Sequence, residues 1–223
     1  MGAVDQDRYR SLIARAAFNA EFFRGTIQDL SAAQRVMTFV GSPSWSKLAS
    51  WPCLKQNAAN DGAVSAVVAS IVDTTQAFWV ELLIVPPFTA STLLLQFNAG
   101  GWRCYYDGTS QLLYLLTTTA VGGNARYCNS SVGSVPVRRP VHAVLGLDPV
   151  GLSGRIFLNG VPAVTAFVNN APPVLCAAAI LNVCGVGGGS MRSMIARVWQ
   201  GTPSNEDCQA LYQQAKLLVG GEV

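Results

Sequence analysis

The chain has 223 residues, of which 50% are hydrophobic and 12% are charged, and its formal net charge is +3. This length suffices for one large buried core, so we expect a single domain with at most an appended arm. No basic run is longer than Arg138-Arg139, and no stretch approaches the roughly 18 apolar residues of a membrane-spanning helix, so we expect neither nucleic acid nor a membrane as a partner. The charged residues near the N-terminus do not fit a signal peptide, so we expect a protein made in a cytoplasm and not secreted by that route.

Two features of the composition concern the surface and the cysteines. The mean hydropathy is +0.31, which is high for a chain that stands alone in solution. Either the surface is rich in uncharged polar groups or part of it is buried against neighbouring chains, and we favour the second interpretation. Six cysteines occur without a Cys-x-x-Cys spacing, and in the absence of a secretory signal we expect buried free thiols rather than disulfides.

The first 25 residues have helical periodicity. Between residues 5 and 25, apolar side chains recur at helical spacing, acids stand at the front and Gly25 stands behind. The segment is rich in Ala and poor in β-branched residues, which disfavours a strand. We therefore predict an amphipathic helix or arm over residues 1–28 and a main domain over residues 29–223. We expect the arm to dock on a neighbouring subunit, so that its deletion leaves the main domain folded.

Residues 73–119 hold the strongest strand signals. The segment 77–85 is apolar and β-rich, which predicts a central strand, and Pro86-Pro87 ends it because proline donates no ladder hydrogen bond. Segments 92–97, 102–106 and 111–118 predict a meander, with turns at residues 98–101 and at Asp107-Gly108. From 120 to 137 the composition turns to Gly, Asn, Ser and Val, which predicts a long loop or an edge hairpin.

The last third of the chain predicts three strands and a helix. The strand GRIFLNG (154–160) ends in Asn159-Gly160, the dipeptide that most easily supplies two residues of positive φ in a tight hairpin turn. A further strand ends near Trp199. The closing helix is expected to begin after Thr202 or Ser204, because both are good N-cap residues, and to stop at Gly220-Gly221.

The order of these segments resembles the laminin-G-like, concanavalin A-like lectin/glucanase family. The closing half of that family has a fixed succession: a strand around a His-Val pair, a strand ending in Asn-Gly, an Ile-Gly strand, a strand ending in Val and an aromatic residue, and a short helix. The matching residues in this chain are His142, Asn159-Gly160, Ile180 and Val198-Trp199. With the weaker likeness of Asp29-Leu30-Ser31 to the family's opening, the resemblance covers roughly residues 30–215. It implies an all-β fold, a two-sheet antiparallel jelly-roll sandwich with a C-terminal helix. It also offers an alternative for the N-terminus, a first strand over residues 12–18.

The sequence lacks the residues that catalysis in this fold requires. Glucanases of the family use two carboxylates about 5 Å apart on one strand. His142 is the only histidine and lies in an apolar segment, so we interpret it as a structural sheet residue with a hydrogen-bonded ring. The adjacent pair Glu206-Asp207 belongs to a helix N-terminus, and the other acids near predicted strands stand alone: Asp73, Glu81, Asp107 and Asp148. We therefore expect no catalytic residues and no enzyme.

We predict neither a metal nor a cofactor. The glycine-rich GVGGGS (185–190) is not followed by the Lys-Ser/Thr of a phosphate-binding loop, so we interpret it as a hairpin loop. Lectin-type members of the family bind calcium through loop oxygens. The candidates here are too few for the about 6 to 8 oxygen ligands that calcium takes: Asn60, Asp61, Asp107 and Asn124.

Aromatic side chains beside amide or arginine groups are the best candidates for ligand binding. They lie on the predicted strand 102–106 and on the segment after the meander: Trp102, Tyr105, Tyr106, Asn124, Arg126 and Tyr127. Because strand side chains alternate, Trp102, Cys104 and Tyr106 share one face, whereas Arg103 and Tyr105 share the other. The alternative interpretation of Trp102 and Tyr106 is that they pack in the core.

Two hypotheses about function remain. Stand-alone domains that resemble this family are similar to accessory proteins of bacteriophage particles, which predicts a non-enzymatic structural or display protein located in a virion: a capsid decoration, tail or fibre-associated subunit. Its partners would be other virion subunits or further copies of itself. The alternative is a carbohydrate-binding, lectin-like module that binds a host-surface glycan.

Overall fold

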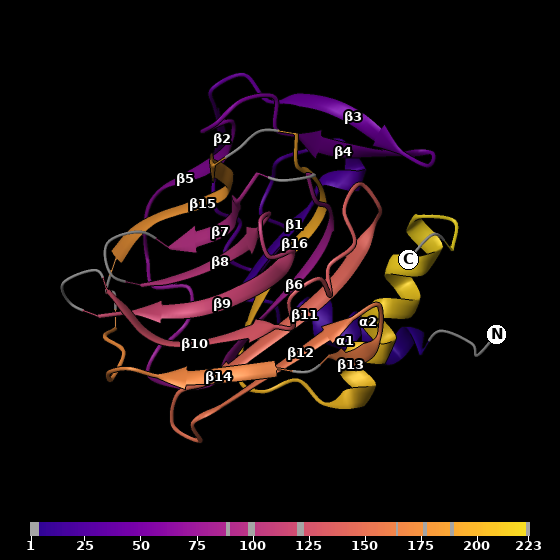
Figure 1. The fold of residues 1–223 in the computed structure, drawn as a ribbon. Coiled ribbons are helices and arrows are strands. Elements are labelled where there is room, and N and C mark those ends of the chain that lie inside the picture. Colours follow the sequence, from indigo (N-terminus) through magenta and orange to yellow (C-terminus); the bar gives the residue numbers. More distant parts are fainter. Residues whose placement is uncertain are drawn as a thin grey trace.

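The chain folds into two antiparallel sheets that face each other as a sandwich (Figure 1). The computed structural model describes residues 5–87, 90–97, 101–119, 123–163, 165–175, 178–187 and 190–221. Within these residues each sheet has eight strands. The predicted fold class, a two-sheet antiparallel sandwich with a C-terminal helix and an N-terminal helix, is confirmed.

Sheet A has the strand order β13-β12-β11-β6-β16-β4-β3, and β1 pairs with β16 beside this path. Its strands are β1 (Phe18–Glu21), β3 (Ser44–Leu48), β4 (Trp51–Lys55), β6 (Phe78–Val85), β11 (Val141–Asp148), β12 (Ser153–Leu158), β13 (Val161–Ala163) and β16 (Arg192–Gln200). The predicted central strand is β6, which is buried at every residue between β11 and β16. The predicted Asn159-Gly160 turn joins β12 to β13, with φ values of 50° and 74°.

Sheet B has the order β14-β10-β9-β8-β7-β15-β5-β2. Its strands are β2 (Met37–Val40), β5 (Gly62–Ala69), β7 (Thr92–Phe97), β8 (Trp102–Asp107), β9 (Leu112–Thr118), β10 (Asn124–Ser130), β14 (Thr165–Asn169) and β15 (Ala178–Gly187). The strands β7, β8 and β9 form the predicted meander, whose first turn lies mostly outside the described residues. The prediction of a loop or edge hairpin over 120–137 was wrong for β10, which pairs on both sides, with β9 and with β14.

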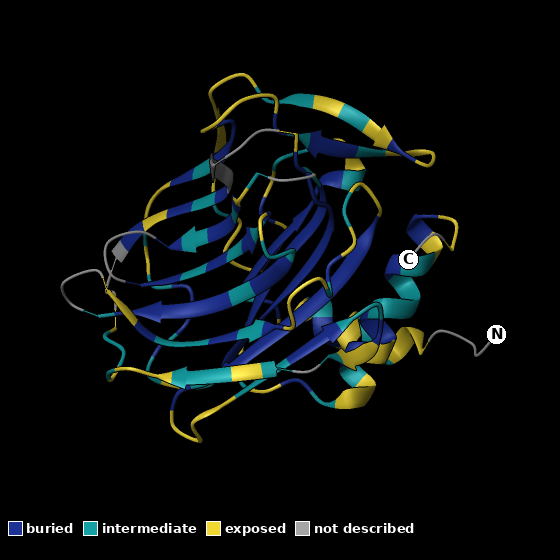
Figure 2. Ribbon diagram, in the orientation of Figure 1, coloured by how far each residue is buried: buried dark blue, intermediate teal, exposed yellow. Residues whose placement is uncertain are grey.

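The main core fills the space between the sheets (Figure 2). Its largest side chains come from both sheets and include Trp102, Tyr106, Phe18, Phe78 and Phe97. Cys53, Cys104, Cys128 and Cys208 are buried free thiols, as predicted, and burial raises the pKa of Cys128 and of Cys208 to about 12. Cys176 and the side chain of Cys184 lie outside the described residues.

Two helices cover the outer face of sheet A. They are α1 (Gln6–Ala14) and α2 (Asn205–Leu218), and Ser204 is the N-cap of α2, in a capping box with Asp207. Trp79 and Trp199 stack at 4.0 Å between their ring centroids beneath Leu12 and Leu211. No helix in the described chain packs on the outer face of sheet B (Figure 1), so that sheet presents its outer side chains to solvent. Neither helix has the length and hydropathy of a membrane-crossing segment.

The N-terminal helix is shorter than predicted. It ends at Ala14, and residues 18–21 form β1, which pairs with β16 with Phe18 opposite Val198, before the short 3-10 helix Phe22–Arg24. Pairing of β1 with β16 places Phe18 and the following Phe22 in the core, where both are almost completely buried, and this tertiary gain outweighs the helical propensity of the segment. Because β1 is part of sheet A, removal of residues 1–25 is expected to unfold the sandwich, contrary to the expectation from the sequence that the main domain stays folded without them. The boundary between an arm over 1–28 and a domain over 29–223 stays a prediction.

Candidate binding site on the outer face of sheet B

The predicted ligand-binding residues on β8 lie on the two opposite faces of the strand. Trp102 and Tyr106 point into the core and are fully buried, Trp102 against Phe78 and Tyr106 with its hydroxyl 3.4 Å from the carbonyl oxygen of Pro87. A ligand at the surface does not reach them, so core packing is the interpretation that the burial supports. Tyr105 has the opposite orientation and stands partly exposed on the outer face.

Three tyrosines form a row across β8, β9 and β10 on this face. Tyr105 lies directly opposite Tyr114, and their rings stack at 4.6 Å between centroids with planes 9° apart. Tyr127 follows, with its ring centroid 6.0 Å from that of Tyr114 and tilted by 55°. We call Tyr105, Tyr114 and Tyr127 the tyrosine row. Tyr114 was not among the predicted residues, because it lies in an apolar run. Leu113 and Leu115 on either side of it point into the core, so strand alternation indicates that Tyr114 points outward.

The hydroxyls of Tyr105 and Tyr114 have raised pKa values. Burial, followed by the neighbouring Tyr114 and Asp107, raises the pKa of Tyr105 to about 12. Burial and Asp107 also raise the pKa of Tyr114. These two tyrosines therefore offer neutral hydroxyls that both donate and accept hydrogen bonds, beside ring faces that carry no net charge.

An open hollow of about 310 Å³ lies beside the row. Its lining combines apolar, hydroxyl, amide and guanidinium groups: Ser91, Thr92, Leu93, Arg103, Tyr105, Leu116 and Asn124. Asn124 and Tyr105, both predicted as ligand-binding residues, thus share one hollow. No described residue forms an ion pair or hydrogen bond with the guanidinium of Arg103, which lines this hollow.

Two charged residues near the row, Arg126 and Asp107, form hydrogen bonds that hold the neighbouring strands and turns in place. Arg126, predicted to bind ligand, donates from Nε to Asn169 Oδ1 at 2.8 Å and from Nη1 to the carbonyl of Pro149, so it braces β10 against β14 and the turn after β11. Burial tends to raise the pKa of Asp107, but hydrogen bonds from Thr109, Ser110 and Ser91 outweigh burial and lower it. These contacts fix the end of β8 and with it the position of Tyr105.

The candidate calcium residues do not converge. The carboxylate of Asp61 accepts hydrogen bonds from the backbone N–H groups of Ser42, Asn57 and Ala58, at 2.8 to 3.1 Å, and so anchors two loops. Asp107 is likewise held in its own turn. In the part of the chain that the structure describes, no three His, Cys, Asp or Glu side chains gather in a group that could hold a metal ion.

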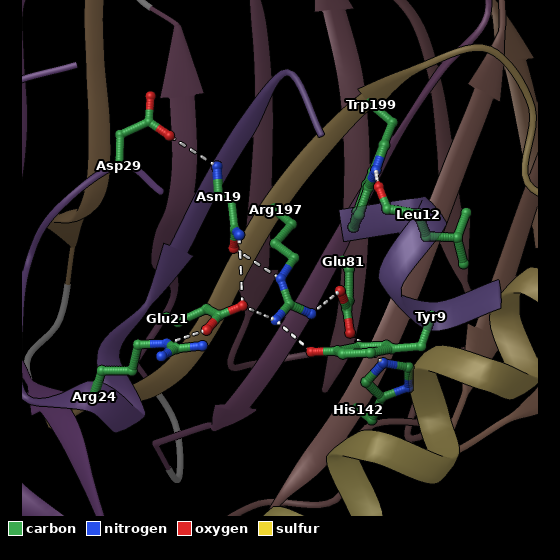
Figure 3. Close-up of polar contacts among 10 residues, drawn as sticks. All are labelled: Tyr9, Leu12, Asn19, Glu21, Arg24, Asp29, Glu81, His142, Arg197 and Trp199. Atoms are coloured by element: carbon green, nitrogen blue, oxygen red, sulfur yellow. Dashed lines mark hydrogen bonds and ion pairs between the residues drawn. The ribbon is translucent and has the colours of Figure 1, made fainter. Parts of the chain in front are cut away.

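A second polar cluster lies on sheet A and is buried (Figure 3). Arg197 on β16 donates from Nη1 to Glu81 at 2.8 Å, from Nη2 to Glu21 at 2.6 Å, from Nη2 to the Tyr9 hydroxyl at 3.1 Å and from Nε to Asn19 at 2.9 Å. We call Arg197, Glu81, Glu21 and their partners the Arg197 network. The sequence suggested that Glu81 stands alone, but in the structure it does not. Four segments that are distant in sequence, α1, β1, β6 and β16, meet around Arg197.

The Arg197 network joins helix α1 to the sheet. Glu81 also contacts Nε2 of His142 at 3.0 Å, whereas Nδ1 of that ring has no hydrogen-bond partner among the described residues, so the prediction of a hydrogen-bonded histidine holds for one nitrogen. Glu81, His142 and Arg197 have no exposed surface. Two carboxylates do converge here, but both are held in ion pairs, Glu81 by Arg197 and Glu21 by Arg197 and Arg24.

Comparison with known proteins shows the fold. No protein-family model and no characterised protein matches the sequence. Similar solved structures include the binding domain of botulinum neurotoxin serotype D (TM-score 0.72, 9% identity, 94% of this chain and 53% of that one). Another is the binding domain of Paraclostridial Mosquitocidal Protein 1 (TM-score 0.71, 12% identity, 91% and 53%).

A third is botulinum neurotoxin type C, whose cell entry depends on interaction with two ganglioside molecules (TM-score 0.67, 12% identity, 92% of this chain and 53% of that one). This chain spans about half the length of these neighbours. At these identities the likeness establishes that the chain has the β-sandwich fold found in toxin binding domains.

Proposed function

We propose that this protein is a carbohydrate-binding module that holds its ligand against the tyrosine row. The observation that carries the proposal is the row itself: three adjacent, partly exposed tyrosine rings on a sheet face without a helical cover, next to a hollow. Sugar rings present apolar C–H faces together with hydroxyl edges. Aromatic plates flanked by a few hydrogen-bonding groups match both parts of such a ligand.

The polar groups beside the row have the chemistry to orient a sugar. Arg103 contributes N–H donors that form no hydrogen bond with any described residue, and Asn124 contributes a donor and an acceptor at the rim of the same hollow. Leu93 and Leu116 supply apolar lining. This division into an aromatic contact and a few directional hydrogen bonds is typical of sites that bind neutral polar ligands.

The structural neighbours support the proposal at a general level. They are binding domains rather than catalytic domains, and one of them belongs to a toxin that interacts with gangliosides, which are glycolipids. The virion accessory role, with other virion subunits as partners, stays a prediction from the sequence. A carbohydrate-binding face would give such a subunit an adhesive task at a host surface.

A glycan-array screen of the full chain, run with calcium and again with a chelator, tests the proposal. We expect selective binding to a defined set of glycans, and we expect Tyr105→Ala to weaken it at least about tenfold, the loss of roughly one aromatic contact of ~1.4 kcal/mol. Trp51→Ala is the matched control, because Trp51 is an exposed aromatic residue on an edge strand pair of sheet A. A blank array from folded protein, or equal losses in both variants, would refute the proposal.

A further inference from the structure

The strands β3 and β4 form a hairpin over residues 44–55, which we call the β3–β4 hairpin, and it carries the two exposed tryptophans of the chain. Trp45 is 40% exposed and Trp51 is 43% exposed. The other three tryptophans are buried: Trp79, Trp102 and Trp199. The ring of Trp51 meets Phe23 edge to face at 6.0 Å between centroids, and the ring of Trp45 meets Phe39 in the same way at 6.2 Å. Both rings are therefore held in place at the surface.

The hairpin extends past the sheet that anchors it (Figure 1). In the described chain only Leu54 and Lys55 of β4 pair with β16, so the end of the hairpin with the turn at residues 49–50 lies beyond this pairing. β3 is the edge strand of sheet A on this side. No further strand of the described chain therefore flanks the projecting end.

Each face of the hairpin carries one tryptophan and one lysine. Trp45 and Lys47 lie two residues apart on β3 and share one face, whereas Trp51 and Lys55 lie four residues apart on β4 and share the other. The faces differ because Trp45 lies opposite Leu54, which is three residues from Trp51 on the same strand. An aromatic ring and a cation thus stand together on both sides of the hairpin.

The surface of the hairpin has a net positive charge. Between residues 30 and 60 the chain has bases but no acid. The acids that bracket this segment are buried: Asp29 is held in an ion pair, and Asp61 accepts hydrogen bonds from three backbone N–H groups. No described residue forms an ion pair with Lys47 or Lys55. Both ammonium groups are therefore without a neutralising partner among the described residues.

We propose that the β3–β4 hairpin binds the surface of a bilayer that contains anionic phospholipids. Tryptophan rings are favoured at the level of the lipid headgroups, because the ring is apolar and its N–H finds a polar partner there. Lysine places its apolar stem against hydrocarbon and its ammonium group among the phosphates. The hairpin offers one such pair of side chains on each face.

The arrangement on two faces favours a fluid partner over a rigid one. A flat protein surface or a sugar ring covers one face of a two-stranded hairpin and leaves the tryptophan of the other face in water. Lipids instead move aside for an inserted turn and surround it, so that Trp45 and Trp51 are covered together. The positive charge then selects anionic over zwitterionic lipids.

This contact needs no membrane-spanning helix. The sequence predicted no membrane partner because no stretch is long enough to span a bilayer, and no helix of the described chain is. Binding at the headgroup layer requires only apolar side chains and basic groups at the surface. The proposal is also independent of the carbohydrate site, because the tyrosine row belongs to sheet B and the hairpin to sheet A. Either one can fail without the other.

Co-sedimentation of the full chain with vesicles tests the proposal. The vesicles contain phosphatidylcholine, with or without about one third phosphatidylserine, and no glycolipid, so that the tyrosine row has no ligand. We expect binding to the anionic vesicles to be at least about tenfold tighter than to the neutral ones, and to weaken as salt rises from about 50 to about 500 mM.

Substitutions in the hairpin should weaken this binding. We expect Trp45→Ala, Trp51→Ala and Lys47→Gln each to raise the dissociation constant by about three- to tenfold. Arg10→Gln is the matched control for Lys47→Gln, because Arg10 is an exposed cation on α1 and its loss changes the net charge equally. This control should bind the vesicles as the wild type does.

Tryptophan fluorescence adds a readout at the hairpin itself. Because the other three tryptophans are buried, we expect a blue shift and quenching by brominated lipid in the wild type, both reduced in Trp45→Ala and in Trp51→Ala. A wild-type chain that binds neither kind of vesicle, or binds both equally, would overturn the proposal, as would binding that the hairpin variants leave intact. Binding to soluble heparin or to an oligonucleotide without binding to vesicles would assign the hairpin to another polyanion and equally overturn it.

Discussion

Removal of the buried Arg197 guanidinium should expose how much the Arg197 network contributes to stability. In Arg197→Met, Glu81 and Glu21 lose their shared partner while Glu81 keeps no exposed surface. Leaving a buried carboxylate without its cation costs about 3 to 5 kcal/mol of unfolding free energy. Arg24→Met is the control: Arg24 also pairs with Glu21, but its side chain is 59% exposed, so its loss should cost no more than about 1 kcal/mol.

The pH dependence of stability should change sign in the variant. In the wild type, burial tends to raise the pKa of Glu81, but the charge of Arg197 and the contact with His142 outweigh burial and lower it below 4.5. A carboxylate with a lowered pKa stabilises the folded state above its unfolded pKa, and this contribution is lost as the pH falls through the folded pKa. Without Arg197, burial dominates and raises the pKa of Glu81. The variant should then become less stable as the pH rises from about 4.5 toward neutrality.

Urea unfolding of the wild type and both variants, followed by tryptophan fluorescence at pH 7 and at pH 5, measures both effects. We expect Arg197→Met to lose several times more stability than Arg24→Met at pH 7, and to recover part of the loss at pH 5. Equal destabilisation by the two substitutions, or an Arg197 variant that is no more stable at pH 5 than at pH 7, would refute the assignment of Arg197 as the charge that balances the buried carboxylates.

Three further predictions concern the fold. Deletion of residues 1–25 should abolish cooperative thermal unfolding, because it removes β1 with the buried Phe18 and Phe22; a truncated chain that still melts cooperatively would show that the sandwich stands without them. Trp102→Ala should cost about 3 to 5 kcal/mol in urea unfolding, the loss expected for a fully buried tryptophan, and a cost below about 1 kcal/mol would contradict its place in the core. Gly160→Ala should cost about 2 kcal/mol or more, because Gly160 has a φ of 74° and an added Cβ would lie 2.4 Å from the Tyr212 ring; an unchanged melting temperature would disprove that packing.

The sequence correctly predicted the elements that depend on residues close together in the chain. The apolar run of β6, the Asn159-Gly160 turn and the capped helix α2 each depend on residues within a few positions of one another. The break between α1 and β1 was missed because Phe18–Glu21 has weak strand propensity. It becomes a strand through pairing with β16, almost 180 residues away in sequence.

The candidate site was partly predictable for the same reason. Alternation along β8 correctly separated Trp102 and Tyr106 from Tyr105, but alternation alone does not say which face points outward. That depends on which face of sheet B packs against sheet A. Tyr114 joins the row only because β9 pairs with β8 in one register, and the Arg197 network forms only because β1, β6, β11 and β16 are neighbours in sheet A.

The most direct test of the carbohydrate-binding proposal is an NMR titration of the isotope-labelled chain with the strongest glycan from the array. We expect saturable amide shifts that concentrate on β7 to β10, around Arg103, Tyr105, Tyr114 and Tyr127, and that disappear in Tyr105→Ala while the rest of the spectrum stays unchanged. Saturable shifts that cluster elsewhere, such as the loops at one end of the sandwich or the β3–β4 hairpin, would contradict the assignment of the tyrosine row as the binding site.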